Sequence, residues 1–274
     1  MNRFIFVNPQ WQGGNDMDTY HGAREIEDFY LYDVEYTELE VSLDPISLKN
    51  SEKIIGQDVI VKQTEDALEK LRFAKRGKSL TVGGGCDADV ASIYYLNQHF
   101  TGDLAVLWFD AHGDLNTPSE SGSKLFYGMP VRTLLGESDG VFDHIITEPL
   151  KADQIVNVGG RVLDDTEIAY FEKAQIPVIP VHNNERLFED ICQTVKSTGK
   201  RRLYIHLDLD VLDPCGHLQT PVPEPQGLSS DDLMPLLEKL SREFHLTGLG
   251  IFQYKNSGQK SDLMDQLIDF GLNF

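Results

Sequence analysis

Two stretches of the sequence place acidic side chains and a histidine directly at the end of apolar runs. The first apolar run covers residues 104–109 and is followed by Asp110, His112 and Asp114. These three alternate, so they point roughly the same way in an extended chain. The run before them fits a strand buried on both faces, and open α/β sheets bind ligands at the carboxyl ends of their strands. Two carboxylates beside an imidazole are costly to bury without a cation, which favours a metal site over the alternative of a solvated polar loop.

The second stretch, residues 203–213, carries Asp208 and Asp210 inside an equally apolar run. The two acids share one face of the predicted strand, where they are costly unless they are protonated, paired or bound to metal. An EF-hand does not fit, because its twelve-residue spacing, its glycine and its final glutamate are missing. Four carboxylates and one imidazole from the two stretches suit Mn²⁺ or Mg²⁺. With bridging carboxylates they could hold two ions that activate water for hydrolysis.

A glycine-rich turn offers a competing function. Gly83 and Gly85, with an alanine three residues later, match the dinucleotide fingerprint between a strand and a helix. Asp87 and Asp89 argue against a nucleotide, because they would repel its pyrophosphate at the start of the helix. In the metal interpretation the glycines let the backbone come close to the ions, and Cys86 faces them.

Strands alternate with helices along the whole chain. This order predicts a parallel sheet with helices on both faces, in one domain over residues 1–274. The expected strands cover 3–7, 30–41 (an extended segment), 79–82, 104–109, 155–158, 177–181, the second acidic run and 246–254. The expected helices cover 21–29, 61–74, 88–100, 129–135, 164–174, 185–197, 230–244 and 261–270.

Composition narrows the classes of partner. Lys and Arg number 24 against 44 Asp and Glu, which gives a formal net charge of −20. That balance argues against nucleic acid and anionic membrane surfaces as partners. The three cysteines lack any CxxC spacing, and the amino-terminal apolar run is too short for a signal peptide. We therefore expect a cytoplasmic protein.

With both acidic motifs and the glycine turn, the sequence resembles the ureohydrolase family of arginases, agmatinases and formimidoylglutamases. Residues 110–118 match the family motif DAHxDxNTP, and residues 208–214 match DxDxxDP. The resemblance covers most of the chain. It implies a three-layer α/β/α sandwich with a mainly parallel sheet, and two Mn²⁺ ions bridged by a hydroxide that attacks a guanidinium or formimino carbon. It also implies a homo-oligomer, commonly a trimer or hexamer.

The resemblance also implies a set of metal ligands. One ion would be held by Cys86, Asp110, Asp114 and Asp208, and the other by Asp110, His112, Asp208 and Asp210. Asp210 would in addition take part in the proton transfers of the attacking water. Cys86 departs from the family, which has histidine there, and a thiolate is softer than Mn²⁺ prefers. The ion at that position would bind weakly or be another metal; alternatively, Cys86 is a buried thiol beside a single ion.

Several positions point to an amino-acid substrate. By the resemblance, Asn116 and Ser123 hold the α-carboxylate and Asp164 meets the α-amino group, which favours an arginine-like molecule over agmatine. A helix cap is the alternative role for Asp164. Thr220 keeps its family identity and is expected to line the pocket.

Two departures alter the expected substrate. Tyr127 stands where arginases have a histidine for proton transfer, and Gln253 stands where the family has a glutamate that pairs with the guanidinium. Losing that carboxylate disfavours a cationic group by several kcal/mol, as an order of magnitude. Nω-hydroxyarginine is less basic, so we predict its hydrolysis to ornithine and hydroxyurea. The alternatives are an ordinary arginase or formimidoylglutamase, and a catalytically silent family member that binds an amino acid.

Overall fold

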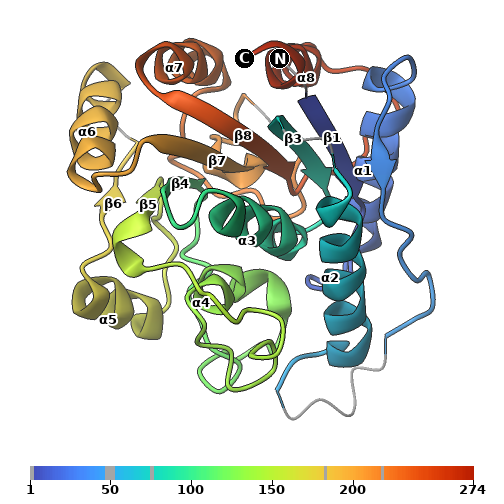
Figure 1. Cartoon of the computed structure of the whole chain (residues 1–274). Coiled ribbons are helices and arrows are strands. Elements are labelled where there is room, and N and C mark those ends of the chain that lie inside the picture. The colour runs from blue at the N-terminus through green and yellow to red at the C-terminus, as the bar shows by residue number, and fades with distance from the viewer. Residues whose placement is uncertain (1–2, 47–52, 75–76, 182–183, 217–218) are drawn as a thin grey trace.

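A single parallel sheet organises the chain (Figure 1). The computed structural model describes residues 3–46, 53–74, 77–181, 184–216 and 219–274. The strands are β1 (Arg3–Asn8), β2 (Thr37–Glu38), β3 (Lys78–Gly83), β4 (Leu104–Phe109), β5 (Ile155–Val158), β6 (Val178–Ile179), β7 (Arg202–Asp208) and β8 (His245–Phe252). Their order in the eight-stranded sheet is β2-β1-β3-β8-β7-β4-β5-β6, and every neighbouring pair is parallel.

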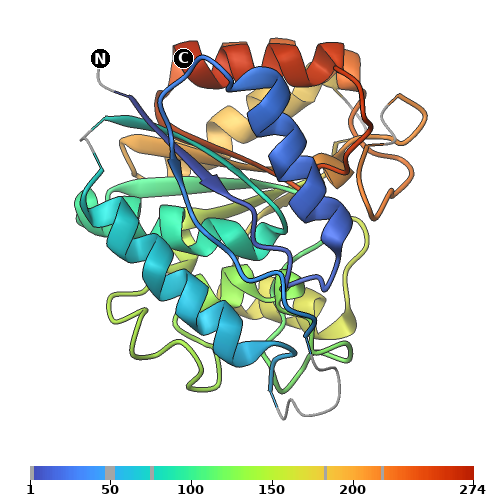
Figure 2. The same ribbon diagram turned by 90° about the vertical axis from the view of Figure 1, so that its right-hand side faces the viewer.

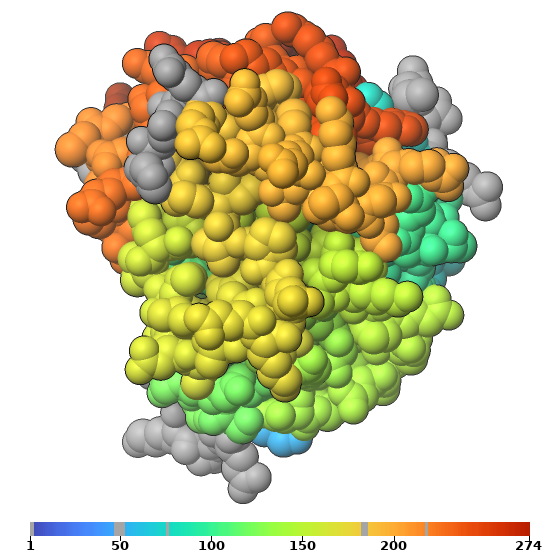
Figure 3. Space-filling model, turned by 90° about the vertical axis from the view of Figure 1, so that its left-hand side faces the viewer, coloured from blue at the N-terminus to red at the C-terminus, as the bar shows by residue number. Residues whose placement is uncertain are grey.

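Helices cover both faces of this sheet. They are α1 (Met17–Tyr30), α2 (Gln57–Arg72), α3 (Val90–His99), α4 (Pro130–Leu134), α5 (Asp165–Ala174), α6 (Asn184–Ser197), α7 (Ser230–Glu243) and α8 (Asp262–Asn273). Helices α1, α6, α7 and α8 bury apolar side chains against one face, and α2 to α5 against the other (Figures 1 and 2). Figure 3 shows the β6 edge, where α5 and α6 lie one below the other. The predicted three-layer α/β/α sandwich is confirmed. None of the helices described has the length and apolar character needed to cross a membrane.

The central strand β4 explains why both layers are needed. All six of its residues are buried. Ala105, Leu107 and Phe109 belong to the core under α1, α6, α7 and α8, whereas Val106 and Trp108 belong to the opposite core. Alternation with apolar side chains on both faces is what a doubly covered parallel strand requires, so the prediction for this run is confirmed.

The predicted extended segment 30–41 is wrong for most of its length. Helix α1 begins earlier than predicted, at Met17, because the Asp16 side chain caps it by accepting from the Asp18 N–H at 2.9 Å. The helix then runs on to Tyr30. Only Thr37–Glu38 pairs with β1, as a two-residue edge strand.

The predicted strand 177–181 is also shorter in the structure, where β6 is Val178–Ile179. Pro177 has no N–H to donate, which suits the edge of a sheet. Its carbonyl accepts from the Asn157 N–H at 3.0 Å, at the start of the pairing between β5 and β6.

Candidate metal centre and substrate pocket

The acidic motifs meet because the strands that carry them are neighbours. In the β4–β7 pairing Phe109 lies opposite Leu207, so Asp110 and Asp208 leave the sheet side by side. A short 3-10 turn after β3, Cys86–Asp89, brings a thiol to the same place. The Cys86 Sγ donates to Asp208 Oδ2 at 2.8 Å. Side chains from three parts of the sequence therefore converge at the carboxyl edge of the sheet, all of them buried.

One group of ligand atoms contains the predicted imidazole. His112 Nδ1 lies 2.9 Å from Asp210 Oδ2 and 3.4 Å from Asp110 Oδ1. The Ala111 N–H donates to Asp210 Oδ1 at 2.9 Å, and the His112 N–H donates to Asp110 Oδ1 at 2.6 Å. One ligand atom from each of Asp110, His112 and Asp210 falls within 4.8 Å of the other two. Backbone N–H groups thus hold both carboxylates in a geometry that could accept one cation.

A second group includes a residue that the sequence analysis missed. Ligand atoms of Cys86, Asp110 and His206 also lie within 4.8 Å of one another, and all three side chains are buried. His206 alternates with Asp208 and Asp210 along β7 and its end, at positions i, i+2 and i+4. That same alternation had identified the acids, and extending it by one step towards the amino terminus would have included the histidine.

Burial and repulsion between neighbouring acidic groups raise the pKa values of several side chains in this cluster. Burial raises the pKa of Asp208 well above its usual range, and the nearby Asp210 and Asp110 raise it further. Burial and Asp110 likewise raise the pKa of Asp114 well above its usual range and that of Asp210 to about 6. The pKa of the Cys86 thiol is raised by burial and by Asp208. A bound cation would relieve the repulsion between these groups, so the cluster is suited to bind one.

His112 carries part of the compensating charge. Burial lowers the pKa of its imidazole, but the contacts with Asp110 and Asp210 outweigh burial and raise that pKa far above its ordinary value. Asp114 Oδ2 is buried without a hydrogen-bond partner among the described residues. An orphaned carboxylate oxygen beside further carboxylates, an imidazole and a thiol is a donor set that fits a divalent cation.

A pocket of about 410 Å³ opens beside this cluster. It includes two of the predicted metal ligands and four of the predicted substrate or proton-transfer residues: His112, Asp114, Asn116, Ser123, Tyr127 and Asp164. Tyr127 is half-buried, and burial together with Asp114 raises the pKa of its phenol, which keeps it protonated.

Two of the three predicted contacts to the amino acid, Asn116 and Asp164, belong to one hydrogen-bonded group, whereas Ser123 lies outside it. Asn116 Nδ2 donates to Asp164 Oδ2 at 2.8 Å, and Thr166 Oγ1 donates to Asn116 Oδ1 at 2.7 Å. Asp164 is also the residue before the first turn of α5, where its N–H donates to Glu167 Oε2 at 2.9 Å. The two alternative roles of Asp164 are therefore compatible, because one residue begins the helix and faces the pocket.

Thr220 and Gln253 are not among the residues that line this pocket. Gln253 follows β8 with a φ of 57°, is 6 % exposed, and donates its backbone N–H to the Gly84 carbonyl at 2.9 Å. The Thr220 hydroxyl is buried and has no hydrogen-bond partner among the described residues.

Close packing against other parts of the chain explains why glycine is needed at two positions of the turn after β3. A Cβ on Gly83 would lie 2.3 Å from the Phe252 ring, and one on Gly84 would lie 2.0 Å from the Gln10 carbonyl oxygen. At these two positions glycine is therefore required by packing against the end of β8 and the residues just after β1. The predicted approach of the backbone to ions stays a prediction. The turn still delivers Cys86 to the cluster.

Two further residues that the sequence analysis missed position the ligands. Arg161 donates to the carbonyls of Asp210 and Glu224, at 2.8 and 2.9 Å, and so ties the loop after β5 to the loops after β7. Asn157 Nδ2 donates to the His112 carbonyl at 2.9 Å. The sequence could have indicated Asn157 and Arg161, because they lie at or just after the end of β5, the strand next to β4.

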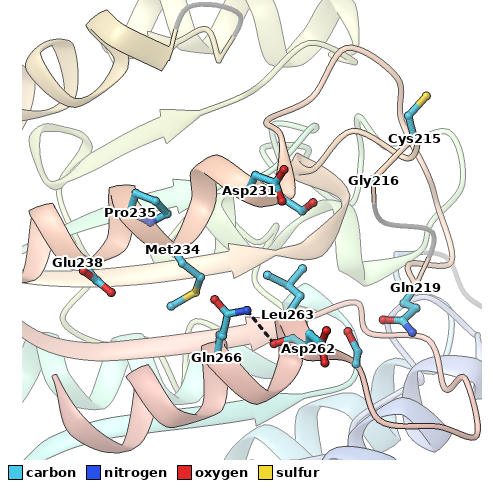
Figure 4. A pocket seen from close by; sticks show the side chains of 12 residues that line it. Cys215, Gly216, Gln219, Asp231, Met234, Pro235, Glu238, Asp262, Leu263 and Gln266 are labelled. Atoms are coloured by element: carbon cyan, nitrogen blue, oxygen red, sulfur yellow. Dashed lines mark hydrogen bonds between the residues drawn. The ribbon is translucent and has the colours of Figure 1, made fainter.

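A larger hollow of about 860 Å³ lies elsewhere, between α7, α8 and the loop at Cys215 (Figure 4). Met234 from α7 and Gln266 from α8 point into it, and Gln266 donates to the Asp262 carbonyl at 3.2 Å. It contains none of the predicted site residues, so size alone does not identify the chemical site.

Comparisons with known proteins agree with this geometry. The sequence profile described as "Arginase family" matches residues 10–257. An arginase of Staphylococcus aureus is 32% identical over 180 residues, which cover 64% of this chain but only 57% of that relative. An N(1)-aminopropylagmatine ureohydrolase of Thermus thermophilus is 26% identical over 239 residues, 86% of this chain and 74% of the relative.

Solved structures share the fold. An Entamoeba histolytica arginase in complex with L-ornithine superposes with a TM-score of 0.86 at 17% identity, covering 98% of this chain and 95% of that one. A Bacillus subtilis arginase superposes with a TM-score of 0.79 at 22% identity, covering 99% and 97%.

Proposed function

Because this chain belongs to the arginase family, we propose that it is a metal-dependent hydrolase that cleaves a guanidino carbon–nitrogen bond of an arginine-like amino acid. The observation that carries the proposal is the convergence of the buried Asp110 and Asp210 with the partly exposed His112, beside a pocket that contains Asn116 and Asp164. Relatives named for two different substrates, arginine and aminopropylagmatine, support the reaction class more strongly than any one substrate.

The metal is proposed to be two divalent ions, with Mn²⁺ preferred at the oxygen-rich position. Cys86, Asp110, Asp114 and Asp208 would hold one ion, and Asp110, His112, Asp208 and Asp210 the other. When bound, such ions supply a Lewis acid that activates water for hydrolysis. A thiolate is a poor ligand for Mn²⁺, so the ion at Cys86 is the weaker of the two if both are Mn²⁺.

The protein's own groups handle the protons. Asp210 is fixed by the Ala111 N–H and faces His112 Nδ1 at 2.9 Å, so it is placed to accept a proton and pass it on. Tyr127 contributes a protonated phenol to the pocket wall. We assign it the hydrogen-bond donor role towards the departing nitrogen that a histidine would otherwise have.

The substrate is proposed to be an α-amino acid. The pocket volume of about 410 Å³ is within the range of small-molecule sites. Asn116 and Ser123 would bind the α-carboxylate, and Asp164 the α-amino group. Agmatine lacks that carboxylate and would not make the proposed contact with Asn116 and Ser123.

Nω-hydroxyarginine is the preferred candidate within this class. Gln253 does not line the pocket of about 410 Å³, and its place beside the guanidino group is proposed from the family resemblance alone. Its neutral amide cannot form an ion pair with a guanidinium, and a weakly basic hydroxyguanidine loses less by that exchange. Water then cleaves the bond between the guanidino carbon and the chain nitrogen and gives ornithine and hydroxyurea. Arginine is the second candidate, favoured by the similarity to the staphylococcal arginase.

The experiment that tests the reaction class compares metal-stripped and Mn²⁺-reloaded protein for release of ornithine. We expect release to stop on stripping and return on reloading, and Asp210→Asn to lower kcat by about 10²–10⁴-fold. Asp165→Asn, an exposed neighbour of the pocket, is the control and should retain activity. Equal activity of stripped and reloaded protein would refute metal dependence.

A further inference from the structure

His206 lies behind the acidic cluster and has no role in the reaction described above. Its side chain is 0% exposed. The imidazole stacks on Trp108 with ring centroids 3.5 Å apart and on Phe252 with centroids 4.9 Å apart, at interplanar angles of 7° and 10°. Two aromatic rings therefore fix the plane of the imidazole on β7.

Asp89 fixes the ring within that plane. His206 Nδ1 lies 2.8 Å from Asp89 Oδ2, and the Tyr204 hydroxyl donates to Asp89 Oδ1 at 2.6 Å. A carboxylate that accepts from Nδ1 places the proton on that nitrogen and leaves the lone pair on Nε2. The same carboxylate–imidazole arrangement orients most histidines that bind metal.

The second ring nitrogen of His206 lacks a partner in the part of the chain that the structure describes. His206 Nε2 is buried without a hydrogen-bond partner among the described residues. An unsatisfied buried polar atom costs about 1–3 kcal/mol, which a phenylalanine in the same stack would avoid. A purely structural histidine therefore does not account for this nitrogen, whereas a ligand would.

Two further side chains that could bind a metal lie close to His206. A ring nitrogen of His206 lies within 4.8 Å of Cys86 Sγ and of an Asp110 oxygen, and Asp89 already occupies Nδ1. Cys86 lies in the turn after β3, and its Sγ donates to Asp208 Oδ2 at 2.8 Å. A sulfur from the turn after β3, a nitrogen from β7 and a carboxylate oxygen from the end of β4 thus converge.

We propose that Cys86, His206 and Asp110 form a zinc position, separate from the Asp110–His112–Asp210 group that takes Mn²⁺. Thiolate and imidazole are the donors that Zn²⁺ selects, whereas Mn²⁺ selects carboxylates and water. Asp110 is common to both groups and would contribute a ligand to each of the two ions. The inference rests on the proposed function in placing metal at this site, and it replaces a pair of like ions by two different ones.

The test measures ligation directly and does not use turnover. Stripped protein is loaded with Zn²⁺, and its X-ray absorption spectrum is recorded. We expect one sulfur at about 2.3 Å and imidazole nitrogen at about 2.0–2.1 Å from zinc. A zinc spectrum with oxygen ligands alone overturns the proposal, and this measurement on the unaltered protein does not depend on any variant.

Variants then assign the ligands. With Co²⁺ in place of zinc, the thiolate-to-cobalt absorption band should vanish in Cys86→Ser. His206→Phe keeps the aromatic stack and should lower zinc affinity at least about 100-fold, and Asp89→Asn, which only orients the ring, by about 10–100-fold. His112→Asn belongs to the other group and should leave the band unchanged.

The outcomes separate this proposal from the proposed function. Zinc bound with wild-type affinity by His206→Phe, as a folded protein, would overturn the zinc position even if hydrolysis is found. Sulfur and imidazole ligation without any hydrolysis would sustain the zinc position and remove the proposed function.

Discussion

Gln253 is the single residue on which the proposed choice of substrate depends. It lies at the end of β8, held by the Gly84 carbonyl, and its φ of 57° is unusual for a residue other than glycine. A backbone restrained in this way fixes where its side chain starts. Exchange of its amide for a carboxylate therefore changes charge with little change in shape.

We predict that Gln253→Glu shifts preference towards arginine. A buried charge-assisted hydrogen bond contributes about 1.5–3 kcal/mol, so the ratio of kcat/KM for arginine to that for Nω-hydroxyarginine should rise about 10–100-fold. Gln226→Glu is the matched control, because Gln226 is exposed and also has a positive φ, 65°. An unchanged ratio in Gln253→Glu would remove the proposed role of this position.

At the same scale, the sequence predicted most of the acidic cluster but not His206. Asp110, Asp208 and Asp210 were recognisable because acids are rare within apolar strands. A histidine in such a strand is common as an ordinary core residue, so it gave no comparable signal. Its importance depends on contacts with Asp89 and Cys86, which come from a distant part of the chain.

Among the elements, strands and helices were predicted better than their ends. The bounds of β4 were predicted correctly, because a short run of apolar residues is typical of a strand that is covered on both faces. Helix α1 and the short edge strands β2 and β6 were misjudged, because side-chain caps, proline and pairing partners decide where such elements stop.

The turn after β3 yields a stability prediction. A Cβ on Gly84 would meet the backbone carbonyl of Gln10 at 2.0 Å, and backbone cannot move aside cheaply. Gly84→Ala should therefore lower the free energy of unfolding by about 1–3 kcal/mol, measured by urea denaturation. Gly122→Ala, where no atom lies within 4 Å, should be nearly neutral. Equal effects of the two substitutions would contradict the packing account of this turn.

Helix α1 yields a pH prediction through Glu25. Burial raises the pKa of this carboxyl, but hydrogen bonds from the Ser257 and Gly258 N–H groups outweigh burial and lower it overall. A lowered pKa gives stability that is present above the unfolded-state pKa and is lost as pH falls through the folded-state value.

Glu25→Gln should accordingly cost about 1–3 kcal/mol at neutral pH. The difference from wild type should shrink in acid, because the wild-type carboxylate then becomes protonated too. Thermal unfolding at neutral and acidic pH measures this, with Glu40→Gln, an exposed glutamate, as the control. A difference that grows in acid would refute the sign of the shift.

For the whole molecule, the charge of −20 and the buried acids lead us to expect that bound cations contribute to stability. The sequence predicted a cytoplasmic homo-oligomer of three or six chains, and both statements stay predictions, since assembly depends on surfaces that one chain does not reveal. The residues proposed to bind metal could be predicted from the sequence because they lie in short local motifs, whereas a surface that binds a partner chain has no such motif.

Metal should stabilise the folded chain. A ligand at one hundred times its Kd adds about 2.7 kcal/mol to the free energy of unfolding, so Mn²⁺ or Zn²⁺ should raise Tm over that of the stripped protein. Asp110→Asn should show a smaller rise, because Asp110 belongs to both ligand groups. A Tm that is independent of metal in the wild type would contradict metal binding at the sheet edge.

The most direct test of the account is turnover of four compounds side by side by metal-loaded protein: arginine, Nω-hydroxyarginine, agmatine and formiminoglutamate. We predict the highest kcat/KM for Nω-hydroxyarginine, with ornithine and hydroxyurea formed in equal amounts. The fastest turnover of arginine would keep the reaction class and contradict the proposed substrate. No turnover of any of the four, with bound metal verified, would contradict the enzyme itself and favour a protein that only binds an amino acid.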